Sequence, residues 1–210
     1  MVTPQQQVRV YGLLAELFSA QPDGEITDAV CQMAAALGIG CPEGLALGEL
    51  EREFMELFRL PNPRYVAPYE SVYRDRRTVG TGPDGKPLVV ERLLMGPSTE
   101  AVRQCFMDAG VLPSEDLPDH LGNELRLMSY LWASDARPAD GSTRSLEQLR
   151  AAVRVEHLLK WIGPLREKVM EKERLGFYSA ALELVGVVLR NDEPHDLPEP
   201  PDHVTTGNGG

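Results

Sequence analysis

The segment LPDHLGNELRLMSYLW, residues 117–132, decides the fold class of this chain. Its apolar side chains recur at the three- and four-residue spacing of an α-helix and form two stripes rather than one. A helix with two apolar stripes is buried on most of its circumference, so we predict a core helix over residues 118–134. Asp116 is its expected N-cap, and Pro118 is tolerated in a first helical turn. One stripe consists of Leu117, Leu121, Leu125, Met128 and Trp132, and the other of His120, Glu124, Leu127 and Leu131.

Helical spacing of apolar residues also recurs along most of the remaining sequence. Ser98 is the expected cap of one helix and Gly110 its expected end, whereas the pair Gly163-Pro164 is expected to interrupt another. The pattern predicts an all-α protein of about eight to ten helices in one domain, residues 1–190. The further predicted helical segments are residues 4–18, 26–37, 47–58, 98–107, 145–160, 164–173 and 177–189.

The last segment of the sequence, residues 191–210, is rich in proline and polar residues and has few apolar side chains to bury. Such a composition is typical of disorder. We therefore predict a disordered tail that can be removed after Leu189 with almost no change in stability.

Composition disfavours several classes of function. The formal net charge of −11 disfavours nucleic acid and anionic membranes as partners and suits a basic partner. No apolar run approaches the ~18 residues of a membrane span, and the N-terminal residues lack the pattern of a signal peptide. Of the three cysteines, Cys31, Cys41 and Cys105, one stays unpaired under any disulfide scheme, and none belongs to a C-x-x-C motif. We therefore expect a cytoplasmic protein in reducing surroundings, without stable membrane insertion.

The stretch VGTGPDGKPL, residues 79–88, contains the G-x-G-x-x-G pattern of dinucleotide-binding loops and nearly matches a P-loop. A nucleotide-binding loop must lead into a helix, but Gly85 is followed by Lys86, Pro87 and β-branched residues. The P-loop also requires Ser or Thr after its lysine, where this sequence has Pro87. We therefore predict an exposed turn at Pro83-Asp84-Gly85, flanked by a small hairpin, and no nucleotide binding.

Asp119 and His120, near the start of the predicted core helix, are the main candidates for chemistry. A carboxylate and an imidazole at a helix start could lie at the mouth of a cleft. In the alternative, Asp119 interacts with the helix dipole and His120 hydrogen-bonds Glu124. A small hydrolase that uses Asp119 and His120 is a further alternative, but the sequence offers no nucleophile motif. A small nucleotide-binding regulator is another alternative, which would need the glycine-rich loop to be ordered between a strand and a helix. The H-x-x-x-E spacing could supply two metal ligands, but spacing alone completes no metal site.

Two further stretches have a distinctive composition. RYVAPYESVYRD, residues 64–75, carries Tyr65, Tyr69 and Tyr73 at four-residue spacing around Glu70. Tyrosines suit peptide recognition, and equally they can fix a loop to the core. In the second stretch, residues 155–165, a histidine stands four residues before a tryptophan, which we interpret as packing.

These stretches resemble the TorD/DmsD/NarJ family of molybdoenzyme assembly chaperones over roughly residues 8–190. The motifs occur in the order P-x-E-S-V-Y (68–73), L-M-G (94–96), L-P-D-H-x-x-x-E-L-x-x-M (117–128) and H-L-x-x-W-x-x-P (157–164). Val153 and Leu165 depart from the pattern, since larger aromatic groups are expected beside the last motif.

The resemblance implies an all-helical, cytoplasmic protein that is not an enzyme and has no cofactor of its own. Such proteins bind the N-terminal twin-arginine leader, or an equivalent tail, of a molybdopterin oxidoreductase subunit. They hold this client until its cofactor is inserted and delay its export. The client and the choice between a monomer and a domain-swapped homodimer stay open. Carried over to this sequence, the leader-binding positions are Asp119, His120 and Glu124, and the candidate cleft lining is Tyr69, Glu70 and Tyr73.

Overall fold

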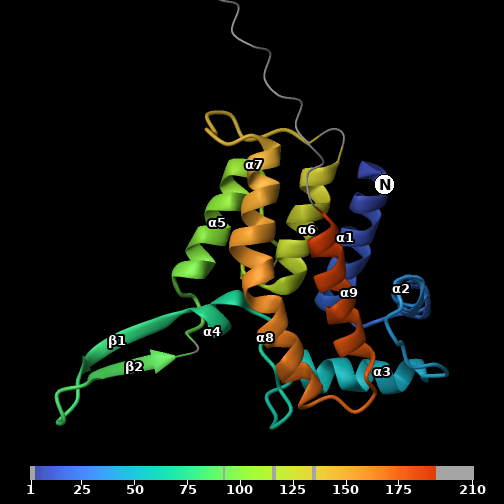
Figure 1. Cartoon of the computed structure of the whole chain (residues 1–210), viewed down its shortest axis with the longest axis horizontal. Helices are drawn as coiled ribbons and strands as arrows, with labels where there is room; N and C mark the ends of the chain where they lie inside the picture. Colours follow the sequence, from blue (N-terminus) through green and yellow to red (C-terminus); the bar gives the residue numbers. More distant parts are fainter. Residues whose placement is uncertain (1–2, 92, 115–116, 134–135, 193–210) are drawn as a thin grey trace, which may run out of the picture.

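The computed structural model describes residues 3–91, 93–114, 117–133 and 136–192. Its main body is helical, which confirms the prediction of an all-α fold, and one two-stranded hairpin projects from that body (Figure 1). The helices are α1 (Pro4–Ser19), α2 (Gly24–Ala36), α3 (Leu47–Phe54), α4 (Glu70–Arg74), α5 (Pro97–Ala109), α6 (Leu121–Trp132), α7 (Leu146–Ala151), α8 (Leu159–Met170) and α9 (Phe177–Asn191), with π-helical turns η1 (Met55–Arg59) and η2 (Ala152–Leu158).

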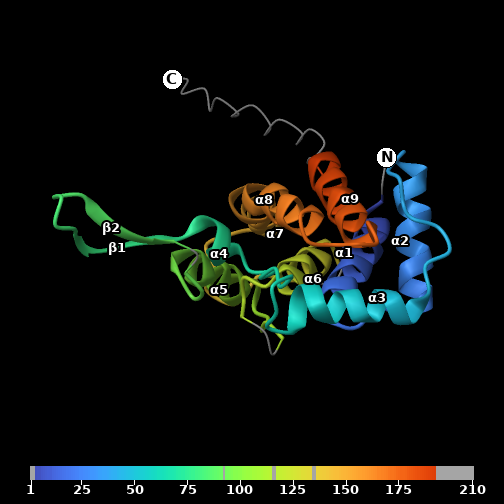
Figure 2. The ribbon, with the colours of Figure 1, turned by 90° about the horizontal axis from the view of Figure 1, so that it is seen from below.

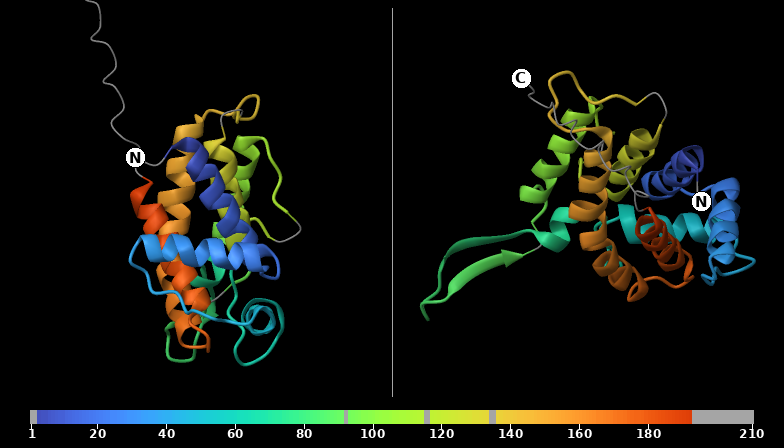
Figure 3. Two further views of the ribbon diagram at one scale, coloured as in Figure 1. Left: turned by 90° about the vertical axis from the view of Figure 1, so that its right-hand side faces the viewer. Right: turned by 45° about the horizontal axis from the view of Figure 1, so that its top comes forward.

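The core forms where α1, α6, α8 and α9 pack side by side, with α3 crossing one end of the bundle (Figures 1 and 3). The predicted apolar stripes of α6 are buried, because Leu121, Leu125, Leu127, Met128 and Leu131 are at most 1% exposed. Burial on this scale is the main stabilising term of such a bundle. Among the described residues, no helix combines the length and the apolar composition needed to cross a membrane.

Local signals in the sequence account for several helix starts. The side chain of Thr3 accepts a hydrogen bond from the backbone N–H of Gln6, and the Gln6 side chain bonds back to Thr3. Asp23 caps α2 through the backbone N–H of Ile26. Each cap satisfies backbone N–H groups that the helix itself leaves without partners.

Three predicted helix boundaries are wrong. The core helix α6 begins at Leu121 rather than at Pro118, because His120 is its N-cap; the predicted cap Asp116 lies outside the described residues. Gly96, not Ser98, precedes α5, and Ser98 instead bonds the carboxylate of another segment. Finally, α8 continues through Pro164 without interruption.

The glycine-rich stretch forms a turn, as predicted. Strands β1 (Arg76–Thr81) and β2 (Pro87–Glu91) pair antiparallel, with Thr78 opposite Val89 and an irregularity between Thr78 and Gly80. Gly85 adopts a φ of 78°, in the left-handed region that glycine tolerates best. The loop therefore joins two strands and does not lead into a helix, and the hairpin extends well away from the helices (Figure 2).

The cysteines differ in part from expectation. Cys105 is free and buried, which confirms that one cysteine stays unpaired. Cys31 and Cys41, however, form a disulfide, a bond that the reducing surroundings inferred from sequence did not lead us to expect. Cys31 lies within α2 and Cys41 in the loop that follows it. Their Cα atoms are 5.4 Å apart, a separation that a disulfide can span.

The predicted disordered tail wrongly includes Asn191 and Asp192, which the structure describes as ordered. Asn191 is the last residue of α9, and Asp192 is only 5% exposed. The Asp192 carboxylate accepts hydrogen bonds from the Tyr11 hydroxyl (2.6 Å), the Gln7 amide (3.2 Å) and the Trp132 indole (3.3 Å). Asp192 thus ties the end of α9 to α1 and α6, and residues 193–210 lie outside the described part of the chain.

Cutting the chain after Leu189 should therefore lower its stability, contrary to the expectation from sequence. We expect Asp192→Ala to lower the free energy of unfolding by ~1–3 kcal/mol, because buried donors lose their charged acceptor. In a protein of this size, that loss corresponds to a melting temperature lower by roughly 2–10 °C. Thermal unfolding monitored by circular dichroism measures the change. Asp140→Ala, at an exposed acid, is the matched control, and equal melting temperatures for both variants would contradict the role of Asp192.

Candidate functional site

The starts of α4 and α6 are joined by a short backbone bridge between Tyr69 and His120. The N–H of Glu70 donates to the carbonyl oxygen of Asp119 at 3.0 Å, and the N–H of Leu121 donates to the carbonyl of Pro68 at 2.9 Å. The side chain of Asp119 adds a third link, since its Oδ2 accepts from the backbone N–H of Ser71 at 3.0 Å. The Asp119 carboxylate thus satisfies a backbone donor in the first turn of α4.

His120 has a structural role at the start of α6. Its Nδ1 accepts a hydrogen bond from the backbone N–H of Gly122 at 3.1 Å, and its ring lies edge-to-face with Tyr69 at 5.1 Å. The side chain is 2% exposed. A Cβ atom at Gly122 would lie 2.1 Å from the Ser19 hydroxyl, so α6 approaches α1 closely at this point.

Glu70, fully buried in α4, links α4 to η2. Its Oε2 lies 2.8 Å from His157 Nδ1, and its Oε1 accepts from the Arg74 guanidinium. His157 Nε2 in turn lies 4.0 Å from the sulfur of Cys105. Burial lowers the pKa of His157, but the contacts with Cys105 and Glu70 outweigh burial and raise this pKa to about 9. His157 is therefore a cation at neutral pH and pairs with Glu70.

Glu124 lies in the same buried region. Its Oε2 accepts from the Trp161 indole at 3.4 Å. Burial and, secondarily, the negative charges of Glu70 and Asp119 raise its pKa well above the ordinary value. Within the described residues, Asp119 Oδ1 and Glu124 Oε1 are buried and have no hydrogen-bond partner. Two acceptors thus point into the core unsatisfied.

Tyr69, the N-cap residue of α4, and Tyr73, within α4, are partly exposed. Tyr73 stacks on Trp161 at 5.6 Å between ring centroids, and its hydroxyl donates to the carbonyl of Ala67. It also lines a pocket of about 380 Å³ between α4, the base of the hairpin and the end of α8. The pocket is bordered by groups of both charges and by apolar surface: Tyr65, Val66, Ala67, Val72, Tyr73, Asp75, Arg76, Glu91, Lys168 and Lys172.

The structure brings the six predicted site residues together at the joint between α4 and α6, although at different depths. Glu70, Asp119, His120 and Glu124 are buried, whereas Tyr69 and Tyr73 reach the surface. Sequence reasoning missed the polar contacts of His157 and Trp161, which it had treated as packing, and those of Cys105. The signal for the first two was their place in the motifs. Among the described residues, no group of three or more His, Cys, Asp or Glu side chains is arranged to hold a metal ion.

Comparison with known proteins places the chain in a family. A family model described as nitrate reductase delta subunit matches residues 20–167, more than half of the chain. The chain therefore belongs to the nitrate reductase delta subunit family, the TorD/NarJ-type family that its motifs indicated.

Curated relatives of this chain carry the name chaperone protein TorD. The protein of that name from Vibrio cholerae serotype O1 (El Tor Inaba N16961) is 29% identical over 153 residues, which is 72% of this chain and 63% of the relative. The corresponding protein of the Classical Ogawa 395 strain is 27% identical over 155 residues. The chain thus spans 63% of the length of these relatives.

The raised pKa of Glu124 predicts a dependence of stability on pH. A folded-state pKa above the ordinary 4.5 means that the folded protein holds this proton more tightly than the unfolded chain. The resulting stability is fully present below pH 4.5 and is lost as the pH rises through the folded-state pKa. Glutamine cannot ionise, so the melting temperature of Glu124→Gln should gain on that of the wild type as the pH rises from about 4 to about 8.

The measurement is a series of thermal melts across that range, in which the free-energy difference can change by up to about 1.4 kcal/mol per pH unit. Glu16→Gln, an exposed substitution on α1, is the control and should follow the wild type at every pH. A difference in melting temperature between Glu124→Gln and the wild type that stays constant with pH would contradict a raised pKa of Glu124.

Proposed function

We propose that this chain is a chaperone for the maturation of a molybdopterin oxidoreductase and that it binds the N-terminal, twin-arginine type leader of that client subunit. Membership of the family, and relatives named as TorD chaperones, support the class of function. In this proposal the chain acts in the cytoplasm, catalyses no reaction, carries no cofactor and holds the client until its cofactor is inserted.

The observation that carries the proposal is the pair of buried carboxylate oxygens without partners, Asp119 Oδ1 and Glu124 Oε1. A guanidinium group offers several N–H donors in a fixed plane and suits carboxylate acceptors. The arginine pair of a leader is therefore a suitable partner for these oxygens, and its apolar stretch suits the exposed faces of Tyr69 and Tyr73.

Access to the acids requires a movement of α4. This helix has five residues, and the side chain of its own N-cap residue, Tyr69, makes no capping bond, so little of its stability comes from hydrogen bonds within the helix. Glu70 and Ser71 are buried on its inner side, whereas Val72 and Tyr73 line the 380 Å³ pocket on its outer side. In this proposal a leader in the pocket contacts α4, whose Ser71 N–H bonds Asp119, and a shift of α4 would admit an arginine to this carboxylate.

Asp119→Asn tests the role of this carboxylate in leader binding. Asparagine keeps the volume and can still accept from the N–H of Ser71 through its amide oxygen, so the fold should survive. The lost charge should weaken leader binding by ~1–3 kcal/mol, about a 5- to 150-fold rise in Kd. Co-purification identifies the client, and calorimetry with the peptide of its N-terminal leader measures the affinity. His120→Gln should also weaken binding if the imidazole contacts the peptide.

A second peptide, with its two arginines replaced by lysines, makes this test specific. Lysine cannot form a bidentate pair with a carboxylate, so this peptide should bind the wild type weakly. Its affinity should fall little further in the Asp119→Asn variant. Asp28→Asn, an exposed substitution on α2, is the matched control and should leave both affinities unchanged. Unchanged leader affinity with a lowered melting temperature of Asp119→Asn would mean that Asp119 is only structural. If the wild type hydrolyses a substrate and His120→Gln abolishes this activity, the alternative function as a hydrolase would be favoured.

A further inference from the structure

A second hollow lies at the other end of the bundle, between α1, α2 and α9. This groove has a volume of about 510 Å³, and six of its lining residues are apolar: Val10, Met33, Ala36, Leu37, Leu184 and Val188. Leu37 is 48% exposed although it is a large apolar residue. Met33 and Ala36 of α2 and its C-cap residue Leu37 form one wall of this groove, which we call the α2 wall.

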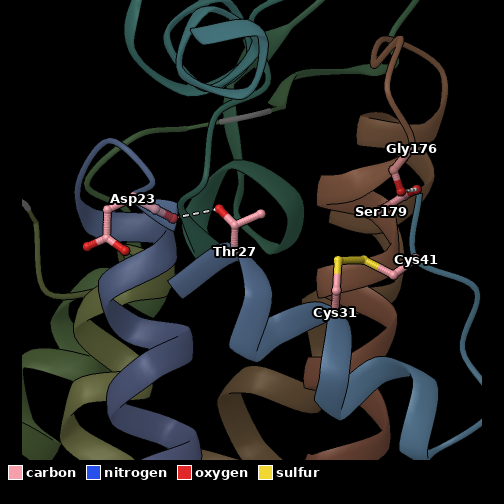
Figure 4. The surroundings of a disulfide bond; sticks show 6 residues. All are labelled: Asp23, Thr27, Cys31, Cys41, Gly176 and Ser179. Carbon is pink, nitrogen blue, oxygen red and sulfur yellow. Dashed lines mark hydrogen bonds between the residues drawn. A yellow bond between two sulfur atoms is a disulfide. The ribbon is translucent and has the colours of Figure 1, made fainter. Parts of the chain in front are cut away.

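The disulfide encloses this wall. Cys31 lies within α2 and Cys41 in the loop that follows, ten residues further along the chain. Met33, Ala36 and Leu37 all lie between the two cysteines, so one covalent ring contains every residue that α2 contributes to the groove. Figure 4 shows the bond between Cys31 on α2 and Cys41, with Gly176 and Ser179 nearby.

Other ties on the segment after α2 are mostly local. The N–H groups of Leu37, Gly38 and Ile39 bond back to the carbonyls of Ala34 and Ala35. Within the described residues, the backbone from residue 40 to residue 45 makes no hydrogen bond to another segment. Packing of the buried Ile39, and of Pro42 against Gly176, supplements the disulfide. The covalent bond is therefore a constraint that the local hydrogen bonds of this loop do not replace.

The two cysteines of the disulfide reach the protein surface. Cys31 and Cys41 are each partly exposed, and both line a separate pocket of about 360 Å³. Thiol–disulfide exchange needs such access for the attacking thiolate. Cys105, by contrast, is 1% exposed and cannot take part without unfolding.

We propose that Cys31 and Cys41 form a reversible thiol–disulfide switch that sets the α2 wall of the apolar groove. A dithiol reductant supplies two electrons and two protons; the S–S bond breaks, two cysteine thiols form, and the dithiol becomes a disulfide. The reverse exchange with an oxidised dithiol restores the bond. In the reducing compartment of the proposed function, disulfides are mostly transient and redox-sensing. The switch itself does not depend on leader binding.

Thiol counting tests whether the bond forms. The full chain has three cysteines, so the oxidised protein, unfolded in denaturant, should show one reactive thiol, and three after treatment with dithiothreitol. Protein equilibrated in a graded series of thiol–disulfide buffers and then alkylated should change from one free thiol to three as the buffer becomes more reducing. Three thiols in every buffer would overturn the proposal.

Hydrogen exchange tests whether the bond controls the groove. Reduction of the wild type should speed amide exchange in residues 31–46 and leave α6 unchanged, because only the first segment loses its constraint. Opening a ring of this length should also lower the melting temperature by about 5–10 °C. Equal exchange of residues 31–46 in the oxidised and reduced protein would overturn the proposal.

Two variants separate the disulfide from other effects of the reductant. The double variant Cys31→Ser/Cys41→Ser should behave like the reduced wild type and should not respond to dithiothreitol. Ala35→Ser, an exposed substitution between the two cysteines, keeps both thiols and should retain the full response. A response that persists in the double variant would overturn the proposal. If the double variant fails to fold, the comparison of oxidised and reduced wild type still decides the outcome.

Discussion

The backbone bridge between Tyr69 and His120 is the interaction on which the other features of the site depend. It fixes the start of α4 against the start of α6, and α6 in turn packs closely on α1 at Gly122. The hairpin follows directly after α4, so the bridge also anchors its base. Because the Asp119 carboxylate caps the first turn of α4, one acidic side chain links the local structure of α4 to the core.

The charged side chains around this bridge are partly paired with one another. Arg74 and the cationic His157 both contact Glu70, and Asp119 adds a second negative charge. Burial raises the pKa of Glu124 and so opposes a further negative charge there. Breaking a buried pair is strongly destabilising, because it leaves a charge without compensation. The charged residues of the motifs therefore depend on one another for the stability of the fold, whatever they bind.

Periodicity predicted the fold class and the buried faces, because both follow from local spacing of apolar residues. It did not predict the start of α6, because the ring nitrogen of His120 caps this helix, whereas the cap expected from sequence was Asp116. Pro164 lies inside α8 because the neighbouring Trp161 and Leu165 are buried and packing overrides the local tendency to break. Long-range facts, such as the contacts of Asp192 and the pairing of Cys31, depend on paths that spacing does not reveal.

The sequence motifs group the candidate residues that lie together in the structure, but they did not predict how deeply each is buried. Spacing on a helix tells which side chains share a face, and it does not tell how much of the rest of the chain covers that face. Asp119 and Glu124 are fully buried, whereas Tyr73 of the short α4 is partly exposed. In the proposed function, the energy needed to move α4 is subtracted from the affinity for the leader. A chaperone must release its client once the cofactor is in place, so a covered acidic site suits transient binding better than an open one would.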